Sequence, residues 1–208
     1  MFGFPKHSPC RSTSSKRVAA YEAAYLTHPE CSVTEIRACM STDAKQQAIG
    51  KMMLDAIARM PRLATLSLSS LSVAMLPAVA AAMRGVGPRL KSLALEDLSE
   101  MPVHGDLFAA LEHLTALERL ELDFGSNSQL SQQDIDALGV ALCQKMTKLR
   151  NLSLTIESTD HVVDSAALAG ILSCHIQSVT LAGDFFCKRF FAAAQRETSK
   201  LEQLRVSG

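Results

Sequence analysis

A short aliphatic pattern that returns seven times constrains the fold of this 208-residue chain more than any other feature. Aliphatic residues stand at positions 0, 3 and 5 of each copy. The four clearest copies are LATLSL from Leu63, LKSLAL from Leu90, LERLEL from Leu117 and LRNLSL from Leu149; IQSVTL from Ile176 and LEQLRV from Leu201 are weaker, and VTEIRA from Val33 is degenerate. Successive copies start 25 to 32 residues apart, with a mean of 28, which is typical of repeat architectures.

Apolar stripes at helical spacing occupy the segments between the copies. These segments are 44–60, 76–84, 106–114, 131–146, 165–173 and 185–197. In the fourth segment, Ile135 and Met146 lie on one apolar face, and Ser131 with Asp134 forms an S-x-x-D capping box at the start. Each repeat, or coil, is therefore predicted to run as strand, turn, helix and return.

Aliphatic strands and helices alternating at a period near 28 resemble the leucine-rich-repeat family, in its ribonuclease-inhibitor-like branch, over roughly residues 30–208. The resemblance implies an α/β solenoid, a right-handed horseshoe with about seven parallel strands on its concave face and helices on its convex face. One departure concerns position 8, where the family usually has Asn or Cys to satisfy backbone groups of the turn. Here that position holds Ser41, Leu71, Leu98, Gly125, Glu157 and Asp184.

The outward side of the predicted sheet is weakly polar, with charge gathered at its middle. Because strand side chains alternate, positions 3 and 5 should point into the core and positions 2, 4 and 6 away from it. Glu96 and Asp123 share position 6 on neighbouring strands, which would place their carboxylates roughly 5 Å apart, with Glu121 beside them. Like charges so placed repel, and Arg119 would offset part of the repulsion.

This face is the predicted binding surface. We expect Glu96, Glu121 and Asp123 to receive a basic residue of a protein partner, the alternative being a solvated and screened face. The full set of candidate contact residues is Glu96, Arg119, Glu121, Asp123, Asn151 and Arg205. An acidic face argues against nucleic acid as the ligand, since phosphate contacts need Lys and Arg. Exposed carboxylates with no third ligand and no burial predict neither a metal site nor a catalytic pair, so we expect no cofactor and no enzymatic activity.

The first 17 residues differ in composition from the rest. Lysine and arginine total 21, as do aspartate and glutamate, yet the four charged residues before Glu22 are all basic. With its serines, Pro5 and Pro9, the segment 1–17 is predicted to be a disordered tail. Two alternatives for this tail are a mitochondrial presequence and a bacterial type III secretion signal. The domain would then span 18–208, and the helix near 18–27 would cap the first coil through Val18, Tyr21 and Tyr25.

Other sequence features bear on location and class. No run of about 18 apolar residues predicts a membrane span, and six cysteines without a CxxC pair favour a reducing compartment. We therefore expect a cytoplasmic protein, or, for an effector, one secreted into a host cell.

The last predicted strand runs to Gly208 with no helix after it, which predicts an open coil edge. Three functional classes follow. They are an adaptor or effector that binds a protein on the sheet, a scaffold that self-associates or docks a missing domain through its C-terminal coil, and the substrate-recognition part of a larger enzyme.

Overall fold

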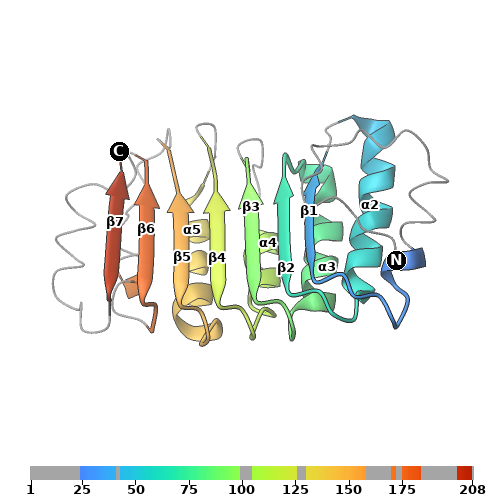
Figure 1. Ribbon diagram of the computed structural model, residues 1–208. Helices are drawn as coiled ribbons and strands as arrows, with labels where there is room; N and C mark the ends of the chain where they lie inside the picture. The colour runs from blue at the N-terminus through green and yellow to red at the C-terminus, as the bar shows by residue number, and fades with distance from the viewer. Residues whose placement is uncertain are drawn as a thin grey trace.

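The computed structural model describes residues 24–40, 43–98, 105–125, 130–157, 170–171, 175–183 and 201–207. Seven parallel strands form one sheet, and their order in space follows their order in the chain (Figure 1). The strands are β1 (Glu35–Cys39), β2 (Thr65–Ser69), β3 (Ser92–Glu96), β4 (Arg119–Asp123), β5 (Asn151–Thr155), β6 (Ser178–Ala182) and β7 (Gln203–Ser207). The fold is therefore α/β with a single parallel sheet.

Helices connect the first five strands. They are α2 (Ala44–Arg59), α3 (Leu76–Val86), α4 (Gly105–Leu111) and α5 (Gln132–Val140), with a 3-10 turn, η1 (Val73–Met75), before α3 and a π-helical turn, η2 (Ala141–Lys145), after α5. Figure 1 shows α3, α4 and α5 behind the sheet, on one of its faces. These helices confirm the first four predicted segments, whereas 165–173 and 185–197 fall largely or wholly outside the described residues. Within the described ranges, no helix has the length and apolar character to cross a membrane.

Every strand occupies positions 2 to 6 of one copy of the aliphatic pattern, as predicted. This holds even for β1, which lies in the degenerate copy that begins at Val33. Residues at equal positions pair across neighbouring strands, for example Leu66 with Leu93 and Leu152 with Val179. A slip of one residue would turn the buried side chains to the opposite face, so burial of positions 3 and 5 fixes the register.

One backbone carbonyl in each coil holds the start of the next strand. The carbonyl of Thr34, at position 1, accepts hydrogen bonds from the N–H groups of Ala64 and Thr65 at 2.9 Å. The same bifurcated arrangement recurs at the carbonyls of Ala64, Lys91, Glu118, Arg150 and Gln177. The coils are therefore spaced by a repeated backbone contact that does not depend on side-chain identity.

The core lies between the sheet and the helices. The aliphatic side chains at positions 3 and 5 of β2 to β6 are buried and pack in one cluster with the inner faces of the helices, including Ile57 of α2, Met83 of α3, Phe108 of α4 and Leu138 of α5. Full burial of one such side chain stabilises the folded state by about 1.5–3 kcal/mol. Because no coil buries its apolar face alone, this stabilisation depends on stacking of neighbours.

Neighbouring helices α2 and α3 come close because one residue of α3 has no side chain. A Cβ at Gly85 would lie 2.6 Å from the carbonyl oxygen of Ala58 in α2. The guanidinium of Arg89 donates to the carbonyls of Gly85 at 3.0 Å and Ala58 at 3.1 Å. Desolvation by burial lowers the pKa of Arg89. Arg89 thus joins the carboxyl ends of two consecutive helices.

The turns after the strands are closed by apolar side chains. After β2 and β3, Ser70 and Asp97 at position 7 adopt left-handed φ angles of 55° and 57°. The following residues, Leu71 and Leu98 at position 8, are buried. After β4 the buried residue is instead Phe124, at position 7. An apolar anchor therefore closes these turns at either of two positions, which explains why position 8 follows no single residue type.

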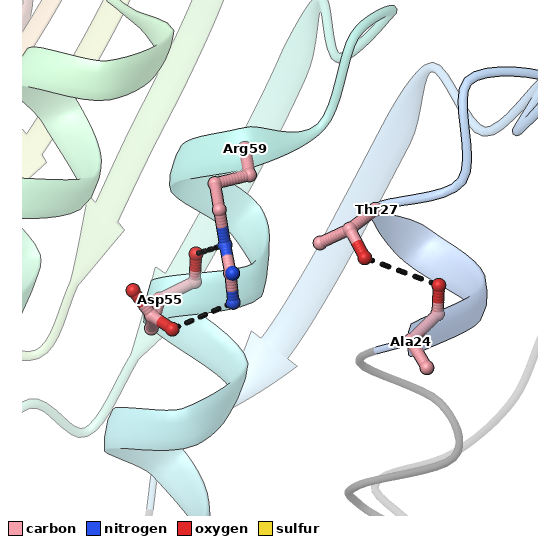
Figure 2. A network of polar contacts seen from close by, with 4 residues as sticks. All are labelled: Ala24, Thr27, Asp55 and Arg59. Carbon is pink, nitrogen blue, oxygen red and sulfur yellow. Dashed lines mark hydrogen bonds and ion pairs between the residues drawn. The ribbon is translucent and has the colours of Figure 1, made fainter.

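The segment before β1 covers part of the first coil. Ala24 to Leu26 are helical, and the Thr27 hydroxyl donates to the Ala24 carbonyl at 3.1 Å; Figure 2 shows this contact and the Asp55–Arg59 pair of α2. Leu26 packs against the core, whereas Tyr25, expected to make that contact, is exposed. The tail 1–17, Val18 and Tyr21 lie outside the described residues.

Candidate functional site

The candidate site is the strand face, defined as the side chains at positions 2, 4 and 6 of the seven strands. Helices α3, α4 and α5 lie on the other side of the sheet, so none of these three covers this face (Figure 1). Ten of its 21 side chains are short and half-buried, namely Thr65, Ser67, Ser69, Ser92, Ala94, Ser153, Thr155, Ser178, Thr180 and Ala182. The longer or charged side chains of the strand face project beyond these short ones.

Arg119 and Glu121 form the centre of the strand face on β4. Nη2 of Arg119 lies 3.7 Å from Oε2 of Glu121, and their side chains are 65% and 40% exposed. In the register of the sheet, Glu121 stands between Ala94 of β3 and Ser153 of β5. Because both neighbours are short, the Glu121 carboxylate stays accessible from solvent. An exposed ion pair at this distance contributes little to stability, so a partner's cation could replace Arg119 at small cost.

Glu96 and Asp123, which share position 6, come directly after the paired part of β3 and β4. The paired register of β3 and β4 ends at Leu95 and Leu122, one residue before them. Glu96 accepts a hydrogen bond from the Ser67 hydroxyl on β2 at 3.5 Å. Asp123 instead accepts from the backbone N–H of Gly125 at 3.0 Å. The two carboxylates therefore have different partners, one across the sheet and one in the turn after β4.

The reason lies in the backbone after β3. Asp97 and its counterpart after β2, Ser70, both take a left-handed conformation, but the next hydrogen bond from the chain after β3 to β4 is made by the N–H of Leu98 to the carbonyl of Asp123 at 2.9 Å. In the preceding coil, the equivalent bond is made by the backbone N–H of Ser70, at position 7, to the backbone carbonyl of Glu96 at 3.2 Å. The ladder of β3 thus skips one residue, which ends the pairing before Glu96.

Of the two remaining candidate residues, Asn151 belongs to the centre of the strand face and Arg205 does not. Asn151 is the register partner of Arg119 on β5 and is exposed. Arg205 lies on β7, with all of β6 between it and β5. With the Gln203 amide oriented to accept, its oxygen lies 3.0 Å from Nε and Nη2 of Arg205. Arg119, Glu121 and Asn151 therefore form one group, and Arg205 belongs to a separate region.

Sequence reasoning missed the polar contacts at the two edges of the sheet. At the amino edge, Lys91 and Glu118, both at position 1, form an ion pair at 3.4 Å. At the carboxyl edge, the Ser70 hydroxyl donates to Asp97 at 3.4 Å. Equal positions in neighbouring coils are the signal for both contacts, and it could have been applied beyond positions 2 to 6.

The strand face offers charged groups and hydrogen-bonding groups. In the part of the chain that the structure describes, no group of three His, Cys, Asp or Glu residues is placed to hold a metal ion.

Comparison of the sequence with family models and with curated proteins finds no match.

Proposed function

We propose that the chain is a leucine-rich-repeat solenoid and that it binds a protein partner on the strand face, without catalysis of its own. The fold part of this proposal is supported by the strand order, the helices on one side and the carbonyl contact repeated in six successive coil pairs. In such solenoids the face formed by the strands is the usual binding surface.

The observation that carries the functional part is the accessible Glu121 carboxylate between Ala94 and Ser153. Its partner Arg119 is more exposed and 3.7 Å away. A basic side chain of a partner protein would lie over Ala94 or Ser153, bind Glu121 and displace Arg119 towards Asn151. Arginine is among the residues enriched at interface hot spots, so an arginine of the partner that binds Glu121 would be such an anchor. An intracellular adaptor or a secreted effector would use the face in the same way.

The experiment compares two charge reversals of the same kind. A partner captured with the whole chain would be titrated by calorimetry against the wild type, Glu121→Lys and Glu112→Lys. Glu112 is an exposed residue just after α4, on the helix side. We expect Glu121→Lys to weaken binding at least about tenfold, as for loss of an interface hot spot, and Glu112→Lys to leave it unchanged.

Equal affinities for the three proteins would contradict the proposal. A charge reversal in the partner that restores binding to Glu121→Lys would identify the basic residue. Asp123 is unsuitable for this test because its carboxylate also holds the Gly125 turn, and its replacement would change the fold as well as the charge.

A further inference from the structure

Strand β7 is the outermost strand on its side of the sheet, and all five of its residues are exposed. Leu204 and Val206, at positions 3 and 5, are 40% and 50% exposed, whereas Val179 and Leu181 at the same positions of β6 are 0% and 1% exposed. The aliphatic side chains at positions 3 and 5, which are buried in β6, are therefore open to solvent in β7.

The backbone of β7 also presents an open edge. The N–H of Gln203 donates to Gln177 and the carbonyl of Ser207 accepts from Gly183, so positions 2, 4 and 6 direct their backbone groups to β6. Alternate residues of a strand direct these groups to opposite edges, so those of Leu204 and Val206 point outward. The carbonyl of Glu202 stands at position 1, where its counterparts in the other coils each accept two N–H groups from the next coil. Such an edge is a template for a further strand.

The other end of the sheet does not complement this edge. At β1, Ile36 is half-buried, and Leu26 and Val33 pack against the core beside it, so the chain itself covers part of that end. Parallel pairing of β7 with β1 of a second copy, in the register of the sheet, would set Arg205 beside Arg37. Like charges on neighbouring strands repel, so head-to-tail stacking is disfavoured.

We propose that two copies of the chain associate through β7, paired antiparallel across a twofold axis. The geometry points to the register in which Leu204 lies opposite Leu204 of the second copy. Gln203 then faces Arg205 of the other chain, a donor and acceptor combination that each strand already makes within itself. The N–H of Val206 reaches the Glu202 carbonyl of the other copy. The register shifted by two residues would oppose the two Arg205 side chains.

This dimer is independent of the proposed function because the strand face stays exposed in it. Stable interfaces bury about 1,600 Å² in total, and one pair of five-residue strands supplies less, so we expect association in the micromolar to millimolar range. A closed twofold dimer leaves no further β7 edge, so association stops at two copies.

The test uses light scattering of the 208-residue chain over that concentration range, with Val206→Asp and a matched control. Val73→Asp is the control, since Val73 in η1 is 41% exposed and lies in the coil of β2, far along the sheet from β7. We expect a shift from one to two copies for the wild type and Val73→Asp, and at least tenfold weaker dimerisation for Val206→Asp.

Amide exchange of the wild type supplies a measurement that needs no variant to fold. We expect the N–H groups of Leu204 and Val206 to exchange more slowly as concentration rises, while that of Leu66 in β2 does not change. The proposal would be overturned by a monomer at all concentrations or by equal dimerisation of the two variants. Amide exchange at Leu204 and Val206 that does not depend on concentration would overturn it as well.

Discussion

The Asp123 carboxylate accepts a hydrogen bond from the backbone N–H of Gly125, 3.0 Å away, and so closes the turn that follows β4. An aspartate that bonds the backbone two residues on forms an Asx turn, which also helps Gly125 to hold its left-handed φ of 58°. Asp123 therefore has a structural role that its place in an acidic cluster did not suggest.

We expect Asp123→Ala to lower the free energy of unfolding by about 1 kcal/mol, because the Gly125 N–H loses its acceptor. Asp123→Asn, whose side-chain oxygen can still accept, should retain most of the stability. Glu96→Ala, on the exposed end of β3, should stay within about 0.5 kcal/mol of the wild type. Urea unfolding followed by circular dichroism measures all three, and equal losses for Asp123→Ala and Glu96→Ala would show that the turn bond contributes nothing.

Gly183, after β6, tolerates no side chain. Its φ is +100°, and a Cβ there would overlap the carbonyl oxygen of Ile156 in the neighbouring coil. We expect Gly183→Ala to destabilise the fold by about 2 kcal/mol or more, through strain and through displacement of the backbone.

Gly105 provides the comparison for that substitution. A Cβ at Gly105, the first residue of α4, meets nothing within 4 Å. Gly105→Ala should therefore be neutral or stabilising by up to about 1 kcal/mol, because alanine loses less backbone entropy than glycine on folding. If thermal unfolding gave the two alanine variants the same midpoint, the close approach at Gly183 would not limit stability.

The capping box of α5 offers a third measurement. The Ser131 hydroxyl oxygen accepts from the N–H of Asp134 at 3.2 Å, and the Asp134 carboxylate accepts from the N–H of Ser131 at 2.9 Å. We expect Ser131→Ala to cost about 1 kcal/mol and Ser131→Thr to cost much less, since threonine also caps. Chemical denaturation would reveal a contradiction if threonine and alanine were equally destabilising.

Arg89 should matter more than its partial exposure suggests. Its guanidinium donates to carbonyls of α3 and α2, so Arg89→Ala removes two charge-assisted hydrogen bonds. After allowance for solvent, we expect a loss of about 1–2 kcal/mol. Arg84→Ala, on the exposed side of α3, should change stability by no more than about 0.5 kcal/mol. Equal unfolding midpoints for the two variants in guanidinium chloride would argue against the link between helices.

The strands were predictable because two constraints agree at each of them. Positions 3 and 5 must be aliphatic to reach the core, and equal positions must pair, so even the degenerate copy from Val33 forms β1. The Ser131 capping box was predictable for a similar reason, since it is local and its partner lies three residues away. Helix boundaries followed less closely, because α4 ends at Leu111 rather than at 114.

The candidate site was only partly predictable. The register of the sheet alone places Arg119, Glu121 and Asn151 together. The register of β3 and β4 ends at Leu95 and Leu122 because the N–H of Leu98, rather than that of Asp97, bonds to the Asp123 carbonyl, a local backbone choice that the β2–β3 pair does not share. No residue pattern at positions 2 to 6 reports that choice. Charge alone does not show that all of β6 lies between Arg205 and β5, so the distance of Arg205 from the centre follows only from the strand order.

In these coils the carbonyl at position 1 receives two N–H groups from the next coil. This repeated contact constrains how such a chain can change in evolution. It fixes the sheet side of every coil to the same short stretch, while copies of the pattern start anywhere from 25 to 32 residues apart. Insertions and deletions are therefore accommodated in the return segments, and growth or shrinkage on the sheet side must proceed by whole coils. The strand face is therefore expected to gain or lose one whole strand at a time.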